Sequence, residues 1–147
     1  MGRSYYSTVI SRPASAVWAA ARDFNGLETW FNPPVTRSEI EDDRAADQVD
    51  CVRRFLFGEA TIREHLVALS DVDRSYTYEF GDPKPFPVNN YLATLRVTPV
   101  TDADASFVEW WTDFDPEDAA QLDHWTAFFA AEVFKPALEG LRAYLAG

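Results

Sequence analysis

One long amphipathic helix near the C-terminus constrains the fold more than any other feature of this sequence. Asp115 can cap this helix, Pro116 suits its first position, and the helical pattern continues to about Tyr144. Its apolar side chains recur every three or four residues, at Leu122, Trp125, Phe129, Val133, Ala137 and Leu141. Such a stripe needs an apolar surface to pack against, and the rest of the chain must supply it. Pro136 removes one helical hydrogen bond, which predicts a kink there.

The preceding residues predict a sheet with one side to bury. Residues 3–10 form the first predicted strand, and two short helices, 13–24 and 26–31, follow it. Further strands are predicted at 35–41, 49–57, 60–69, 75–80, 88–99 and 106–114. Short connections between them indicate an antiparallel meander. We therefore expect an α+β fold of the helix-grip type, in which a curved sheet of six or seven strands packs against the long helix.

A cavity is expected inside this fold. One helix cannot fill the concave side of so large a sheet, so other side chains or an open space must occupy the remainder. Aromatic residues make up 15% of the 147-residue chain, which suits a cavity wall, although a dense core is the alternative. Residues 1–147 are expected to form this single ligand-binding domain.

Composition argues against several other functions. The net charge of −11 repels nucleic acids and anionic membranes. Cys51 is the only cysteine, and His65 and His124 are far apart, so neither a metal site nor a cofactor is expected. The sequence has no signal-peptide pattern and no apolar stretch of membrane length. These features predict a cytoplasmic protein without membrane insertion, either a monomer or a homodimer.

The turn between the third and fourth predicted strands indicates which side chains face inward. Gly58-Glu59 fits a two-residue type II′ turn, whose register places Arg53 opposite Glu64. The same face carries the apolar side chains of Phe55, Phe57, Ile62 and Leu66. The charged pair is either a cross-strand ion pair near the sheet end or a polar anchor inside a cavity.

Later strands add candidate cavity residues. Alternation turns Tyr78 and Tyr91 inward, each with a hydroxyl that needs a partner. The last strand has two possible inner faces. Glu109 and Trp111 lie on one face, and periodicity favours the other, formed by Val108, Trp110, Thr112 and Phe114. The Pro-rich segment 81–88 is expected to form one lip of the cavity mouth.

A resemblance to a known superfamily rests on the segment DFNGLETWFNPPVTRSEIED, followed by VRRF, IREHL, YTYEF and PFPVNNYLATLRV. These motifs resemble the START-like (SRPBCC) polyketide cyclase/dehydrase superfamily, which includes pollen allergens and plant abscisic-acid receptors. The resemblance spans nearly the whole chain and implies that Glu64 and Tyr91 face the cavity. It also matches Glu109 to a receptor cavity glutamate, which turns Glu109 and Trp111 inward, against periodicity. The receptors' hormone-binding lysine has no counterpart, since Pro33 stands nearest.

Three functions are consistent with these features. The first is binding of a hydrophobic or aromatic small molecule, lipid- or polyketide-like, inside the cavity. The second, implied by the resemblance, is a metal-free polyketide cyclase or dehydratase; its candidate catalytic residues are Glu64, Arg53, Tyr91 and Glu109. The third is an interaction or regulatory protein on the same fold. The predicted ligand-binding residues are Trp30, Phe31, Arg53, Phe55, Phe57, Ile62, Glu64, Tyr78, Tyr91, Glu109, Trp111, Trp125, Phe129 and Val133.

Overall fold

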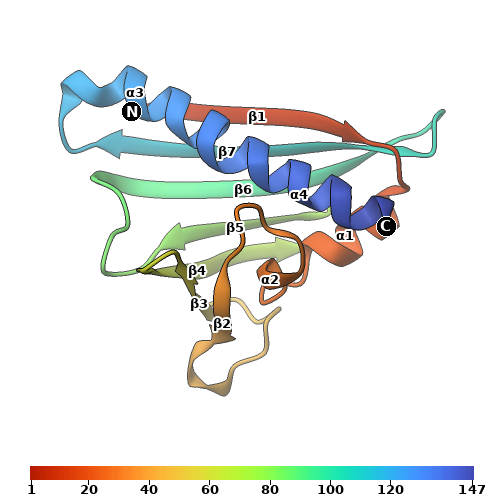
Figure 1. The fold of residues 1–147 in the computed structure, drawn as a ribbon, viewed down its shortest axis with the longest axis horizontal. Helices are drawn as coiled ribbons and strands as arrows, with labels where there is room; N and C mark the ends of the chain where they lie inside the picture. Colours follow the sequence, from red (N-terminus) through yellow and green to blue (C-terminus); the bar gives the residue numbers. More distant parts are fainter.

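In the computed structural model, which describes residues 1–147, a curved seven-stranded antiparallel sheet packs against one long C-terminal helix (Figure 1). The strands are β1 (Gly2–Ile10), β2 (Thr36–Ile40), β3 (Val52–Phe57), β4 (Ala60–Ser70), β5 (Ser75–Phe80), β6 (Val88–Val100) and β7 (Ala105–Pro116). They lie in the order β1-β7-β6-β5-β4-β3-β2. Strands β2 to β7 therefore form a meander, and β1 joins its far end. The predicted helix-grip fold is confirmed.

Two short helices connect β1 to β2 where the sequence predicts them. They are α1 (Ala14–Ala21) and α2 (Leu27–Trp30). A 3-10 turn, η1 (Glu41–Asp43), follows β2. Helix α2 lies against the C-terminal helix, where a Cβ on Gly140 would come within 2.3 Å of the Trp30 carbonyl oxygen. Only glycine permits this close approach, which holds the α2 end of the molecule against the helix.

The C-terminal helix begins later than predicted. Strand β7 continues to Pro116 because Asp115 and Pro116 pair with the first residues of β6. Asp118 caps the helix instead, since its Oδ1 accepts a hydrogen bond of 3.0 Å from the Ala120 N–H. The helix then comprises η2 (Ala119–Gln121), α3 (Leu122–Phe128), the π-helical segment η3 (Phe129–Phe134) and α4 (Lys135–Ala146). The prediction that Asp115 is the cap is therefore wrong.

A π-helical turn stands where the sequence predicts a proline kink. The Ser4 hydroxyl of β1 donates to the Thr126 carbonyl oxygen at 2.6 Å and accepts from the Ala130 N–H at 2.8 Å. Those two backbone groups would bond each other in an α-helix, so Ser4 takes the place of one helical hydrogen bond. The Lys135 N–H then donates to the Ala130 carbonyl, five residues back. Pro136, which cannot donate, follows in the first turn of α4.

Strand β7 turns inward the face that periodicity predicts. Val108, Trp110, Thr112 and Phe114 are buried. Glu109 and Trp111 lie on the outer face, where the Tyr5 hydroxyl donates to Glu109 at 2.5 Å and the Tyr5 ring stacks on Trp111. The expectation that Glu109 and Trp111 face the cavity is therefore wrong. Alternation along β7 allows only one of the two sets to join the core, and the larger apolar set does so.

The hydrophobic core lies between the concave face of the sheet, α1 and the C-terminal helix. Its centre is the stacked pair Trp110 and Phe134, whose ring centroids are 5.0 Å apart. The long helix packs against β1 and β7, so it covers that side of the sheet more closely than the other (Figure 1). No helix in the structure combines the length and apolar character needed to cross a membrane.

Candidate functional site

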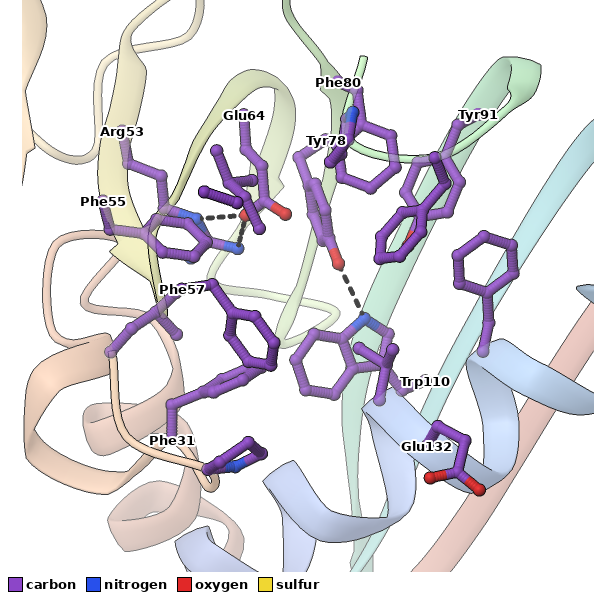
Figure 2. A pocket seen from close by; sticks show the side chains of 18 of the residues that line it. Phe31, Arg53, Phe55, Phe57, Glu64, Tyr78, Phe80, Tyr91, Trp110 and Glu132 are labelled. Atoms are coloured by element: carbon purple, nitrogen blue, oxygen red, sulfur yellow. Dashed lines mark hydrogen bonds and ion pairs between the residues drawn. The ribbon is translucent and has the colours of Figure 1, made fainter. Parts of the chain in front are cut away.

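A cavity of about 410 Å³ lies between the sheet, the C-terminal helix and the residues around α2 (Figure 2). Nineteen residues line it, and 14 of them are hydrophobic. Its volume falls within the range of about 300–1,000 Å³ that is typical of small-molecule sites. The predicted ligand-binding residues that line it are Phe31, Arg53, Phe55, Phe57, Ile62, Glu64, Tyr78, Tyr91, Phe129 and Val133.

The β3–β4 hairpin positions the polar part of the cavity. Gly58 has a φ of +62°, as the first residue of a type II′ turn requires. Arg53 pairs with Glu64 and Phe55 pairs with Ile62, which confirms the predicted register. Both charged side chains therefore extend to the concave side of the sheet together with the apolar ones.

Arg53 and Glu64 form a buried ion pair. Arg53 Nε and Nη2 lie 2.7 and 2.6 Å from the same oxygen, Oε1 of Glu64. Arg53 Nη1 donates to the Phe24 carbonyl oxygen at 3.2 Å, and the guanidinium lies 4.0 Å from the centre of the Phe24 ring. Burial is the largest influence and works to lower the pKa of Arg53, but Glu64 together with Tyr76 and Tyr78 outweighs it, so this pKa is raised. Arg53 is therefore a fixed cation whose contacts are already made.

Glu64 keeps one oxygen free. Both contacts with Arg53 use Oε1, and no protein group donates to Oε2 (Figure 2). The Glu64 side chain is 8% exposed and borders the cavity. Burial raises the pKa of Glu64, and the neighbouring charge of Arg53 opposes this rise. Oε2 is not among the fully buried polar atoms, so it is an acceptor without a protein donor that a molecule in the cavity can reach.

Two tyrosine hydroxyls accompany Glu64 in the cavity wall. The Tyr78 hydroxyl accepts a hydrogen bond of 3.2 Å from Nε1 of Trp110, and its hydrogen bonding toward Tyr91 works to lower the pKa of Tyr91. Tyr91 stacks on Phe80 with ring centroids 3.9 Å apart. Burial raises the pKa of both Tyr78 and Tyr91 well above that of free tyrosine. Both hydroxyls therefore stay protonated hydrogen-bond donors in the cavity wall.

The mouth of the cavity is marked by its exposed lining residues, Pro33, Ala60 and Glu132. Pro85 and Phe86 of the loop before β6 line the cavity, together with Phe128, Glu132 and Val133 of the helix. Both loop residues belong to segment 81–88, so this predicted lip contributes to the cavity wall. Phe86 packs against Phe129 with ring centroids 5.4 Å apart. Glu132 is exposed, so the only carboxylate besides Glu64 in the lining stands at the mouth.

Four predicted ligand-binding residues do not line the cavity. Trp30 is buried behind it against Trp110, and Trp125 packs behind Phe86 and Phe129. Glu109 and Trp111 are on the outer face of β7. The lining residues absent from the prediction are Leu27, Pro33, Ala60, Phe80, Pro85, Phe86, Trp110, Phe128 and Glu132. Alternation with Tyr78 could have identified Phe80, and periodicity along the last strand could have identified Trp110.

The sheet, the helix laid across it and the cavity between them define a helix-grip protein of the START-like class. The chain belongs to the family described as "Polyketide cyclase / dehydrase and lipid transport", whose model matches residues 1–146. This confirms the resemblance seen in the sequence. No curated protein matches the sequence significantly.

Several solved structures have a fold similar to that of this chain. A protein of Thermobifida fusca is 27% identical with a TM-score of 0.85, over 98% of this chain and 93% of that one. The di-domain ARO/CYC BexL from the BE-7585A biosynthetic pathway is 16% identical with a TM-score of 0.81, over 99% of this chain and 47% of BexL. Norcoclaurine synthase from Thalictrum flavum, in complex with dopamine and hydroxybenzaldehyde, is 14% identical with a TM-score of 0.70, over 98% and 85%. The last two similarities show the fold alone.

Proposed function

We propose that this protein binds a small hydrophobic or aromatic molecule, lipid- or polyketide-like, in the cavity between the sheet and the C-terminal helix. The observation that carries the proposal is the free Oε2 of Glu64 in the wall of a largely apolar cavity of about 410 Å³. A cavity that served only packing would gain nothing from a carboxylate oxygen that faces it without a protein donor. The family description and the aromatic ligands of norcoclaurine synthase support the same class of ligand.

Calorimetric titration with 2-naphthol tests this function, because its rings suit the aromatic wall and its hydroxyl can donate to Glu64. We expect saturable binding and a higher midpoint of thermal unfolding in its presence. Tyr91→Phe removes a cavity hydroxyl and should weaken binding, whereas Tyr5→Phe on the outer face should not. Absence of binding by wild-type protein, or equal effects of the two variants, would contradict the proposal.

A second candidate is an enzyme of the cyclase or dehydratase type. It is favoured by the position of Glu64, a carboxylate with a raised pKa in the same wall as the Tyr78 and Tyr91 hydroxyls. In an intramolecular aldol reaction, Glu64 would take a proton from the carbon between two carbonyls. A tyrosine hydroxyl would stabilise the enolate oxygen while the enolate carbon attacks a second carbonyl of the same molecule. The C=O π bond of that carbonyl opens, and its oxygen takes back the proton held by Glu64. Arg53 is committed to Glu64 and Phe24, so it contributes as a neighbouring charge rather than as a donor.

Turnover of a synthetic poly-β-ketone thioester separates this enzyme from a binding protein. Glu64→Gln should abolish cyclisation, because the amide keeps the shape but not the basicity of the carboxylate. Since the variant leaves Arg53 without its anion, circular dichroism must first show that it folds, and residual binding of 2-naphthol then separates lost chemistry from a lost cavity. Unchanged turnover in Glu64→Gln, or no turnover above the uncatalysed rate by wild-type protein, would leave binding as the function.

Three other predictions accompany the proposal. The cytoplasmic location stays a prediction from the sequence. The choice between a monomer and a homodimer stays open in the same way. The alternative role as an interaction or regulatory protein gains no specific support from the cavity.

A further inference from the structure

The cavity is lined by more negative than positive side chains. Three charged side chains line it: Arg53, Glu64 and Glu132. Arg53 is 1% exposed, and its hydrogen bonds go to Glu64 and to the Phe24 carbonyl oxygen. Glu64 therefore neutralises the positive charge of Arg53 at the inner end of the cavity, the part lined by these two residues. No other cation lines the cavity and could pair with a ligand.

The inner end favours an uncharged donor over any ion. Oε2 of Glu64 accepts no hydrogen bond from the protein, so a ligand that donates a hydrogen bond to it is favoured. An ammonium ion would pair with this oxygen but would meet the charge of Arg53, whose Nη2 lies 2.6 Å from the other oxygen. A carboxylate would be repelled by Glu64 and would lose its hydration without gaining a cation. A neutral hydroxyl meets neither obstacle.

The mouth of the cavity carries a negative charge, whereas a site that binds carboxylates needs a positive one. Glu132 extends from the helix on the far side of the cavity from Glu64 (Figure 2). It is exposed and takes part in no salt bridge. Lys84, the cation of the loop before β6, is paired with Glu117 at 2.7 Å. A ligand that reaches the mouth therefore meets an uncompensated negative charge in contact with water.

We propose that the cavity selects aromatic ligands by charge: an uncharged hydroxyl donates to Oε2 of Glu64 at the inner end, a neutral or cationic group lies at Glu132, and ligands with a carboxylate at that position bind more weakly. This inference rests on the proposed binding function and specifies its ligand class. The fold accommodates many ligand chemistries, and these two glutamates determine the selection in this chain.

Small phenols that differ at one end provide the test, by calorimetric titration at pH 7. 4-Ethylphenol and 4-ethyltoluene have the same shape, and only the phenol donates, so the phenol should bind about tenfold tighter or more. Tyramine should bind about two- to fivefold tighter than 4-hydroxyphenylacetate, because Glu132 is partly solvated and the charge effect is screened. Glu132→Gln should remove most of this second difference.

Glu139→Gln is the matched control, since Glu139 is exposed on the same helix outside the cavity. It changes the net charge equally and should leave the ratio between tyramine and 4-hydroxyphenylacetate unchanged. Equal affinities for the two ions, tighter binding of the carboxylate, or equal effects of the two variants would overturn the charge selection while binding itself stands. If neither 4-ethylphenol nor 4-ethyltoluene binds, the proposed function fails, and the selection fails with it.

Discussion

The buried ion pair of Arg53 and Glu64 stands among aromatic rings. The guanidinium lies 4.0 Å from the centre of the Phe24 ring and 5.0 Å from that of Tyr78. Removing two charges from water costs several kcal/mol per ion, which close geometry and further hydrogen bonds must offset. Here the two contacts of Arg53 with Oε1 of Glu64, its hydrogen bond to the Phe24 carbonyl oxygen and the neighbouring ring faces offset that cost. The two residues should therefore be strongly coupled in the free energy of unfolding.

Replacing Arg53 alone should be far more harmful than replacing both partners. Arg53→Met leaves Glu64 buried without its cation, and we expect a loss of about 3–5 kcal/mol in the free energy of unfolding. The double variant Arg53→Met with Glu64→Leu should recover most of this loss. Urea denaturation at pH 7 measures both values. Arg54→Met, at an exposed position on the other face of β3, is the control and should cost less than about 1 kcal/mol.

Additive losses of unfolding free energy in the double variant would show that Arg53 and Glu64 are not coupled.

The pairing of Arg53 with Glu64 could be predicted from the sequence, because a two-residue turn at Gly58-Glu59 fixes the register of its hairpin. The direction of Glu109 could not be predicted from a motif match, since a motif carries no information about which face the strand buries. Burial of Trp110 and Phe114 decides that direction.

At the scale of elements, the contact between β1 and the C-terminal helix explains the helix geometry. Ser4 is 1% exposed, and its hydroxyl bridges the Thr126 carbonyl and the Ala130 N–H. The π-helical segment that begins at Phe129 contributes Phe129, Glu132 and Val133 to the cavity. The sequence predicts the helix from its apolar period, but not this insertion, because Ser4 is 122 residues from Thr126 and has an ordinary sequence context.

Ser4→Ala should destabilise the protein through the helix. Without the hydroxyl, two buried backbone groups lose their partner, and we expect a loss of about 1–3 kcal/mol in the free energy of unfolding. Ser7→Ala changes the same residue type on the opposite face of β1 and should cost less than about 0.5 kcal/mol. Chemical denaturation of both variants compares these values. Similar losses would indicate that the bridge contributes nothing to stability.

At the scale of the whole molecule, the cavity is an incompletely packed part of the core. The sequence predicts such a space because one helix cannot cover seven strands. Its volume could not be predicted, since it depends on how closely the loop carrying Phe86 packs against Phe128 and Phe129. Apolar space without contact atoms loses dispersion energy, so an unfilled cavity of about 410 Å³ lowers the stability that the core could reach. A larger side chain that fills the cavity should therefore lower the affinity for the ligand and maintain or raise the free energy of unfolding.

Val133→Phe places a ring at the mouth and tests this opposition. Val133 is half-buried and lines the cavity, so a larger side chain can enter the space without displacing the sheet. We expect the free energy of unfolding to stay equal or to rise by about 0.5–2 kcal/mol. The affinity for 2-naphthol should fall about tenfold or more, because the ring occupies the ligand's volume. Val67→Phe makes the same substitution at an exposed site on β4 and should change neither quantity. If Val133→Phe loses stability and keeps its affinity, the cavity is not the binding site.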